Sequence, residues 1–516
     1  MSGRNVSVVS VVLFVLFLSL IVPVASITGD PLKGTEKKDD PVGMEYRATP
    51  NVVIGFEENS VAPNVEGASL HGGGRPAFTN RVVGDFGAVG GGDGNLAGDR
   101  ATVSGGSLNQ ASGFRSSVGG GSNNIAHGEH STVSGGSNNT ASATRSTISG
   151  GCYNTASHLD ATIGGGAGNI ASFTHATVGG GTRNTASSLD ATVSGGSNNM
   201  ASGAYTTVSG GSSNLASGFS AVVGGGSGNI ASASNTTVSG GLGNRISDHY
   251  STIGGGLGNT AGNRNEDLAD SRYATVSGGI DNTAAGLGSA VGGGKDNVTQ
   301  GLFSTVPGGF QNHADGHYSF AAGSRANIHS SHPGTFLYAD STDNHFDSNA
   351  ANEFAARATG GIRFVTGVDP LGIPNAGVRL EAGSSSWSSL STRNIKTNLS
   401  FVEGKQVLQK LFNVPISTWS YNDQIPSIQH MGPLAEDFYA VFALGEDEKY
   451  INTVDVDGVA LAAIQGLYQM VREQEDQMMA QRRRIAILEF EKATQQEHLA
   501  ALEARLAKIE KGLGSK

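Results

Sequence analysis

The sequence has few of the residues that build disulfide frameworks and large apolar cores. Its 516 residues include 1 cysteine and 6% aromatic residues. The lone cysteine, Cys152, excludes an intrachain disulfide. We interpret it as a tolerated residue at a turn where related segments place other small residues. Low aromatic content beside 78 glycines argues against several ordinary globular domains.

Basic residues are also in deficit, with 33 Lys and Arg against 44 Asp and Glu. The net charge of −11 argues against wrapping nucleic acid, so no nucleic-acid partner is expected. Only one long apolar run occurs, at residues 6–24. It follows Arg4 and ends in Val24-Ala25-Ser26, so residues 1–26 are predicted to be a secretory signal peptide. Secretion or surface display would follow, and a retained N-terminal membrane anchor is the alternative.

What the chain has in abundance is a 15-residue repeat. A β-branched residue recurs before a run of glycines and small residues, and an asparagine recurs with the same period. An insertion of 8 residues near residues 264–272 interrupts the rhythm once, after which it resumes. Such a period predicts a solenoid or fibre. The recurring β-branched residues before the insertion are Val103, Val118, Val133, Ile148, Ile163, Val178, Val193, Val208, Val223, Val238 and Ile253.

Each repeat has the composition of one coil of a parallel β-structure. Residues 191–203 contain two short extended pieces, around Val193 and around Met200, separated by glycine and asparagine, which favour turns. Stacked coils would place equivalent residues about 4.8 Å apart. One Val or Ile and one Ala per coil bury little surface, while the glycines lose much backbone entropy. We therefore expect a homotrimer, although repeat physics also permits a monomeric solenoid.

The Gly-Gly-x-x-Asn-x-Ala units, such as residues 195–201 and 210–216, resemble the head domain of YadA-like trimeric adhesins. The resemblance implies a left-handed parallel β-roll. Low-complexity disorder is the alternative, but a disordered tract keeps no hydrophobic period over so many copies. The expected organisation is a flexible leader (27–50), irregular capping coils (51–100), β-roll repeats (101–333) and a β-rich neck (334–389).

Four histidines near the end of the repeats, His313, His317, His329 and His332, match no compact metal-ligand spacing. Neither a metal nor a cofactor is expected.

Residues 390–473 have ordinary globular composition and form a small α+β domain in this interpretation. Expected helices are 402–411, 436–444 and 458–471, and 415–421 is expected to be a strand. Asp455 and Asp457 are candidates to cap the last helix.

Four ordered blocks in this domain resemble the endosialidase-type intramolecular chaperone, a self-cleaving peptidase domain at the end of trimeric β-fibres. The blocks are Ser-Thr-Arg-Asn-Ile-Lys (391–396), Trp-Ser-Tyr (419–421), His-Met-Gly-Pro-Leu-Ala-Glu-Asp-Phe (430–438) and Thr-Val-Asp-Val-Asp-Gly with the helix that follows (453–467).

By that resemblance, Ser391 and Lys396 form a catalytic dyad, and the bond that breaks adjoins Ser391, with Ser391–Thr392 the expected site. A serine hydroxyl needs a base, and lysine acts as one only when neutral, which burial favours. The family usually has Asp after the serine, where this chain has Thr392. A chaperone that folds without cutting is the alternative.

From Ile464 onward the apolar period becomes seven. One core position holds Ile464, Val471, Met478 and Ile485, and the pattern continues to Leu513. Seven-residue spacing predicts a coiled coil over 464–513.

The sequence therefore predicts a secreted or surface trimeric β-fibre of adhesin type, which partners with itself and with an unidentified host-surface or glycan ligand. Repeated exposed side chains such as Arg115, His130, Arg145 and Tyr205 would make multivalent contacts. A structural fibre with an uncleaved chaperone is one alternative. A tail-spike-like protein that binds or degrades polysaccharide is another, disfavoured because Asp160 and Asp190 recur without evident partners. Any enzymatic activity would be self-cleavage.

Overall fold

A computed structural model describes residues 49–265 and 267–513, and the chain divides into two compact units at Gly360/Gly361. The predicted signal peptide (1–26) and most of the predicted leader (27–50) lie outside the described residues. Among the described residues, no helix combines the length and apolar character needed to cross a membrane.

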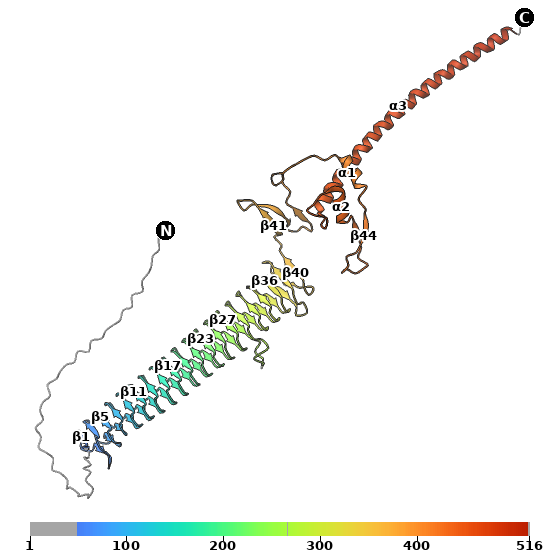
Figure 1. Ribbon diagram of the computed structural model, residues 1–516. Coiled ribbons are helices and arrows are strands. Elements are labelled where there is room, and N and C mark those ends of the chain that lie inside the picture. The colour runs from blue at the N-terminus through green and yellow to red at the C-terminus, as the bar shows by residue number, and fades with distance from the viewer. Residues whose placement is uncertain (1–48, 266, 514–516) are drawn as a thin grey trace, which may run out of the picture. The chain divides into compact units, whose positions relative to one another are not determined.

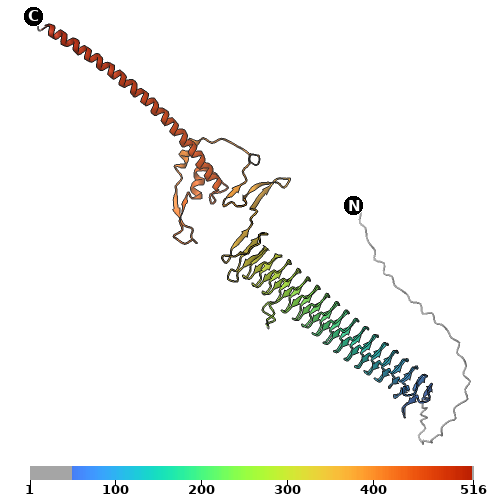
Figure 2. The ribbon, with the colours of Figure 1, turned by 180° about the vertical axis from the view of Figure 1, so that it is seen from behind.

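The first unit is a parallel β-solenoid, as the 15-residue period predicts (Figures 1 and 2). Each coil contributes a short strand to each of two sheets. Equivalent residues pair 15 positions apart, as in Thr132 with Thr147 and Thr140 with Thr155. The first sheet has 21 strands. They are β1 (Val52–Ile54), β3 (Ser69–His71), β5 (Ala88–Val89), β7 (Thr102–Val103), β9 (Ser117–Val118), β11 (Thr132–Val133), β13 (Thr147–Ile148), β15 (Thr162–Ile163), β17 (Thr177–Val178), β19 (Thr192–Val193), β21 (Thr207–Val208), β23 (Val222–Val223), β25 (Thr237–Val238), β27 (Thr252–Ile253), β29 (Thr275–Val276), β31 (Ala290–Val291), β33 (Thr305–Val306), β34 (Gly309–Phe310), β36 (Phe320–Ser324), β38 (Phe336–Ala339) and β40 (Phe354–Arg357).

The second sheet runs along the same stack, again with parallel pairing between successive coils. Its strands are β2 (Ser60–Val61), β4 (Arg81–Val82), β6 (Leu96–Ala97), β8 (Gln110–Ala111), β10 (Ile125–Ala126), β12 (Thr140–Ala141), β14 (Thr155–Ala156), β16 (Ile170–Ala171), β18 (Thr185–Ala186), β20 (Met200–Ala201), β22 (Leu215–Ala216), β24 (Ile230–Ala231), β26 (Arg245–Ile246), β28 (Thr260–Ala261), β30 (Thr283–Ala284), β32 (Val298–Thr299), β35 (His313–Ala314), β37 (Ala326–Ile328) and β39 (Phe346–Asp347).

The core between the sheets holds the expected small apolar side chains. Val193 from the first sheet and Ala201 from the second are fully buried, and their equivalents in other coils are too. Cys152 pairs in register with Ser137 and Ala167, so the neighbouring coils have small residues at its position, as expected.

The recurring asparagine has a second role that its turn preference does not suggest. Asn199 is fully buried, and its backbone N–H donates to Asn184 Oδ1 at 3.0 Å. Its Nδ2 donates to the carbonyl oxygens of Gly195 and Gly211 at 2.8 and 2.9 Å. The same bonds repeat from coil to coil. We call this column of buried asparagines the asparagine ladder, and it supplies polar cohesion inside a single chain.

The first coils and the expected neck differ from the regular repeats. Val52 pairs with Ser69, and Ser69 pairs with Ala88, so the first coils are longer than 15 residues. Parallel pairing continues through β38 and β40. The segment 334–389, expected as a neck, therefore spans both units: its first part extends the solenoid, and its second part opens the next unit.

The second unit contains two small antiparallel sheets and three α-helices. The first sheet comprises β41 (Ile362–Val368), β42 (Pro374–Leu380) and β43 (Trp387–Ser389), and β44 (Ser417–Trp419) pairs with β45 (His430–Gly432). The helices are η1 (Arg393–Ile395, a 3-10 turn), α1 (Gly404–Leu411), α2 (Ala435–Phe442) and α3 (Thr453–Leu513).

Helix α3 is far longer than the helix expected over 458–471, because that expectation divided one continuous helix into a domain helix and a coiled-coil tail. Asp455 and Asp457 lie within it, so the expectation that either caps it was wrong. Asn452 Oδ1 instead accepts a hydrogen bond from the Val454 N–H at 3.0 Å. Acidic Asp455 still lies in the first turn, where the helix dipole favours it.

Helix α1 packs closely on α3 through two glycines. A Cβ added at Gly466 would lie 2.2 Å from the Gly404 carbonyl oxygen, and one at Gly404 would lie 2.6 Å from the Gly466 nitrogen. Lys405 and Glu473 form an ion pair across the same contact. Beyond Gly466, every described residue of α3 is exposed, including the apolar residues at seven-residue spacing.

Candidate functional site

Ser391 and Lys396 lie on either side of the 3-10 turn η1. Lys396 Nζ donates a hydrogen bond to Ser391 Oγ at 2.6 Å. Thr392 and Lys396 bracket the turn with extended backbones, and the Lys396 N–H donates to the Arg393 carbonyl at 3.2 Å. The turn folds the chain back on itself, so the five-residue spacing brings the amine to the hydroxyl.

The strand before the serine fixes its position. β43 pairs with β42, with Ser389 opposite Val378. The Leu390 N–H extends this pairing with a hydrogen bond to the Gly377 carbonyl at 3.0 Å. Gly377 has a φ of 144°, and a Cβ there would lie 2.2 Å from the Phe364 carbonyl oxygen. Glycine is therefore required for the close pairing that holds the residue before Ser391.

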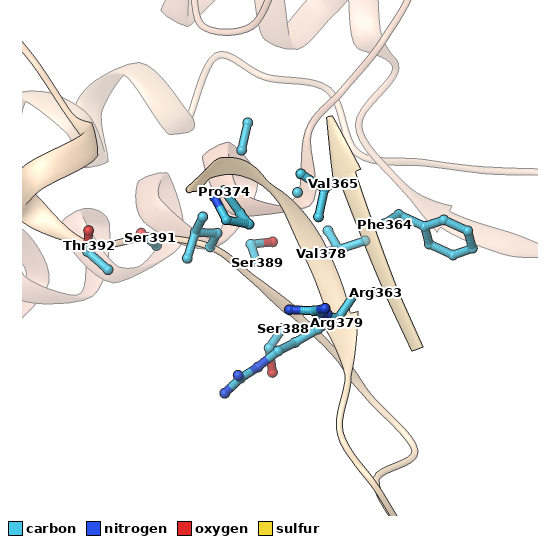
Figure 3. Close-up of a pocket in the computed structure, with 13 residues that line it drawn as sticks. Arg363, Phe364, Val365, Pro374, Val378, Arg379, Ser388, Ser389, Ser391 and Thr392 are labelled. Carbon is cyan, nitrogen blue, oxygen red and sulfur yellow. The ribbon is translucent and has the colours of Figure 1, made fainter. Parts of the chain in front are cut away.

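A cavity of about 480 Å³ opens beside Ser391 and Thr392. Strands β41, β42 and β43 form its walls, and Figure 3 shows Arg363 and Arg379 between the serine end of the site and Phe364. Arg379 also pairs with Glu381. A groove with apolar walls and a guanidinium group suits an extended peptide better than a small apolar molecule.

The dyad has the contact that nucleophilic catalysis needs, but not the enclosure. Hydrogen-bond contact between nucleophile and base is the geometric requirement for activating a serine. Ser391, Thr392 and Lys396 are all exposed in the single chain. Because burial is what favours a neutral lysine, any cutting requires a further surface to cover this pair.

The exposed side chains predicted to make multivalent contacts form one column along the solenoid. Arg115, His130, Arg145 and Tyr205 all occupy left-handed backbone positions, with φ between 57° and 60°. Each of these residues lies at the end of a turn, and the same position recurs every 15 residues along the chain. The structure therefore brings these four residues onto one line of the surface.

The same column corrects the expectation that Asp160 and Asp190 lack partners. Arg145 makes two hydrogen bonds to Asp160, each 2.7 Å long. His175 lies 3.6 Å from Asp160 and 3.0 Å from Asp190. The hydrogen bond from Arg145 lowers the pKa of Asp160, and the same bond raises the pKa of Arg145. The spacing of 15 was the signal for these pairs, since residues one period apart are neighbours in a solenoid.

Two of the four histidines near the end of the repeats, His329 and His332, lie with their ring centroids 5.5 Å apart. His332 Nδ1 lies 2.7 Å from Ser348 Oγ, and His329 lies 3.8 Å from Asp347. Within residues 49–265 and 267–513, no group of three or more His, Cys, Asp or Glu side chains is placed to hold a metal ion.

In comparisons with known proteins, no family model matches the chain and no curated protein matches it. The resemblance to YadA-like heads and to the endosialidase-type chaperone therefore depends on the sequence blocks alone.

Proposed function

We propose that this protein is a secreted or surface trimeric β-fibre of adhesin type whose C-terminal domain acts as an intramolecular chaperone and releases itself by cutting beside Ser391. A parallel β-solenoid of regular coils is compatible with a surface fibre. The observation that carries the self-cleavage proposal is the 2.6 Å hydrogen bond from Lys396 Nζ to Ser391 Oγ. An exposed contact of this kind contributes little to stability.

The proposed reaction uses only groups of the chain and water. Ser391 Oγ attacks the carbonyl carbon of the scissile peptide while Lys396, in its neutral form, takes the hydroxyl proton. The C–N bond breaks, the proton passes to the leaving amine of Thr392, and Ser391 is left as a four-membered lactone, the internal ester of its own carbonyl and Oγ. Water then hydrolyses the ester and restores the serine.

The trimer is proposed because the second unit leaves apolar surface uncovered. On α3, Ile464 is 62% exposed, Ile485 54% and Leu499 58%, all at core positions of the seven-residue pattern. Exposed apolar residues at this spacing are typical of helices that wind around copies of themselves. Neighbouring chains would also supply the cover that the dyad lacks.

Intact-mass analysis of the purified protein tests self-cleavage. Cutting at Ser391–Thr392 yields a fragment of 125 residues, Thr392–Lys516. Ser391→Ala should abolish the fragment, and so should Lys396→Arg, since arginine keeps the charge and the donor but cannot serve as a base. Ser389→Ala, a serine on β43 in the same cavity, is the matched control and should be cut normally.

An uncut wild-type chain would leave the structural fibre with an intact chaperone. A mass series beginning at Ser391 instead of Thr392 would move the scissile bond by one position. Cleavage that persists in Ser391→Ala would refute the dyad.

The chaperone role has a separate test. Chains that end before residue 390 should be insoluble or monomeric, because long-range parallel pairing is slow and exposed to aggregation. A soluble trimer from that truncation would count against the proposal. A screen for glycan hydrolysis addresses the polysaccharide-degrading alternative.

A further inference from the structure

The one insertion in the repeat has no role in the proposed fibre or in its cleavage. It lies between β28 and β29 and projects from the side of the stack (Figures 1 and 2). The coils on either side keep their register across it, with Thr252 opposite Thr275 and Thr260 opposite Thr283. The solenoid therefore does not need these residues, and the insertion calls for an explanation of its own.

At the base of the insertion lies a buried carboxyl group. Asp248 is 1% exposed, at a position where the two preceding coils have Gly218 and Ala233. Its Oδ2 accepts hydrogen bonds from the Asn263 N–H at 3.1 Å and from Ser247 Oγ at 3.2 Å. Its Oδ1 is buried and has no hydrogen-bond partner. A buried carboxylate oxygen without a partner costs free energy unless a ligand satisfies it.

A second carboxyl group, Asp270, comes from the insertion itself. Its Oδ2 accepts hydrogen bonds from Asn263 Nδ2 and Asn265 Nδ2, both at 2.7 Å. Burial raises the pKa of Asp248, and the negative charge of Asp270 raises it further, whereas the bonds from Asn263 and Ser247 lower it. Both carboxyl groups accept hydrogen bonds from Asn263, so two like charges lie beside one residue.

Positive side chains of the described residues do not neutralise this pair. None of their ion pairs includes Asp248 or Asp270. Of the two arginines of the insertion, Arg264 donates from Nη2 to Thr260 Oγ1 at 2.6 Å, and Arg272 has a buried Nε without a hydrogen-bond partner among the described residues. Residues 248–265 and 267–270 thus gather two carboxyl groups and two amide side chains, and none of the described ion pairs supplies a counter-charge to them.

The backbone is fitted closely to the buried carboxyl group. Gly262 has a φ of 105°, and a Cβ there would lie 2.0 Å from Asp248 Oδ2 and 2.4 Å from Ser247 Oγ. A larger residue would displace the carboxyl group. The position of Asp248 is therefore built into the coil and is not an accident of a surface loop.

We propose that Asp248 and Asp270, together with the side-chain oxygens of Asn263 and Asn265, bind a calcium ion at the base of the insertion. Calcium takes six to eight oxygen ligands and accepts carboxylates, amide carbonyls and water in a flexible geometry. Two carboxylates supply charge, while amide oxygens and water complete the shell. Rotating each asparagine amide presents its Oδ1 where its Nδ2 now faces Asp270.

Calcium is a better fit to the chemistry than a transition metal. The cluster contains only oxygen ligands and amides, and neither a thiolate nor an imidazole belongs to it. Calcium sites of extracellular modules have Kd values on the order of 10⁻⁴–10⁻³ M, and a site with two carboxylates belongs in that range. The ion would tie the insertion to the coil that carries Asp248.

Isothermal titration of the metal-free full-length protein with CaCl₂, with MgCl₂ in parallel, tests the proposal. The wild type should bind calcium in preference to magnesium, and calcium should raise its Tm. Asp248→Asn and Asp270→Asn should each weaken calcium binding about tenfold or more, because affinity follows the number of charged ligands. Asp296→Asn, which removes a half-buried carboxyl group beside Lys295 from a turn of a later coil, is the control and should bind as the wild type does.

Asp270 is exposed, so Asp270→Asn keeps the test valid if the buried Asp248→Asn misfolds. Wild-type protein that binds no calcium at 10 mM, roughly ten times the upper end of that Kd range, would overturn the proposal, as would unchanged affinity in Asp270→Asn. A Tm that depends on pH but not on calcium would show instead that the two carboxyl groups share a proton.

Discussion

Replacing one member of the asparagine ladder should weaken the solenoid locally and strongly. Asn199→Ala removes two bonds donated by Nδ2, to Gly195 and Gly211, and the bond that its Oδ1 accepts from the Asn214 N–H at 3.0 Å. Each bond is worth about 1 kcal/mol net, which gives about 3 kcal/mol for the set. The buried Asn214 N–H is left without a partner, which places its own share at about 1–3 kcal/mol, so the total is at least about 3 kcal/mol.

Hydrogen exchange at the Asn214 amide is the direct assay, because stability in a solenoid is the sum of neighbouring coil contacts and openings are local. A loss of about 3 kcal/mol corresponds to exchange roughly a hundredfold faster. Asn198→Gly is the matched control. Asn198 is exposed and has a φ of 55° that glycine tolerates, and its side chain donates to Ser197 Oγ.

Equal protection of the Asn214 amide in Asn199→Ala and Asn198→Gly would refute the reasoning. It would show that water or a relaxed backbone replaces the ladder at no cost. Asn199→Asp sharpens the test, since a carboxylate would face the two carbonyl oxygens that the amide now satisfies, and it should be worse than alanine.

Two further predictions concern the two units separately. Gly466→Ala should destabilise the second unit by about 1–3 kcal/mol in denaturant unfolding, because its Cβ would meet the Gly404 carbonyl oxygen at 2.2 Å. Gly458→Ala on the same helix has open space around its Cβ and should be neutral or stabilising by up to about 1 kcal/mol. In the solenoid, hydrogen bonds from Thr359 hold the pKa of Asp340 well below its usual value of 3.8. The stability that Asp340 provides is present above about pH 4 and is lost as the pH falls toward the lowered pKa, so Asp340→Asn should flatten the pH dependence of the unfolding midpoint in that range.

The period of the solenoid could be predicted from the sequence because each regular coil has a small apolar residue at the same two positions. Val193 and Ala201 sit in the core as expected. The ladder was not predicted, because asparagine's tolerance of positive φ suggested a turn. The left-handed position belongs to Asn198, one residue earlier, and Asn199 is buried.

The candidate sites differed in how much the sequence reveals. Composition and spacing alone do not distinguish Ser391 and Lys396, and only the family resemblance singles them out. Their contact depends on a 3-10 turn that has no strong sequence signal. The sequence does mark Asp248 as unusual, because Gly218 and Ala233 occupy the same position in the two preceding coils. From sequence alone, however, a carboxyl group in a repeat is normally expected to be exposed to solvent.

Helix α3, more than the solenoid, is the part of the structure that needs partner chains. The sequence suggested that coils with so little apolar bulk need neighbouring chains. The asparagine ladder supplies part of the missing stabilisation within one chain, because each coil forms buried hydrogen bonds to the coil before it. No such compensation exists on α3, where the described residues beyond Gly466 are all exposed. An isolated helix of this length gains most of its stability from packing an apolar face, so it has more to gain from association than the coils do. Assembly that begins at α3 would therefore bring chains together before the coils form, and the coils would then close largely on their own hydrogen bonds.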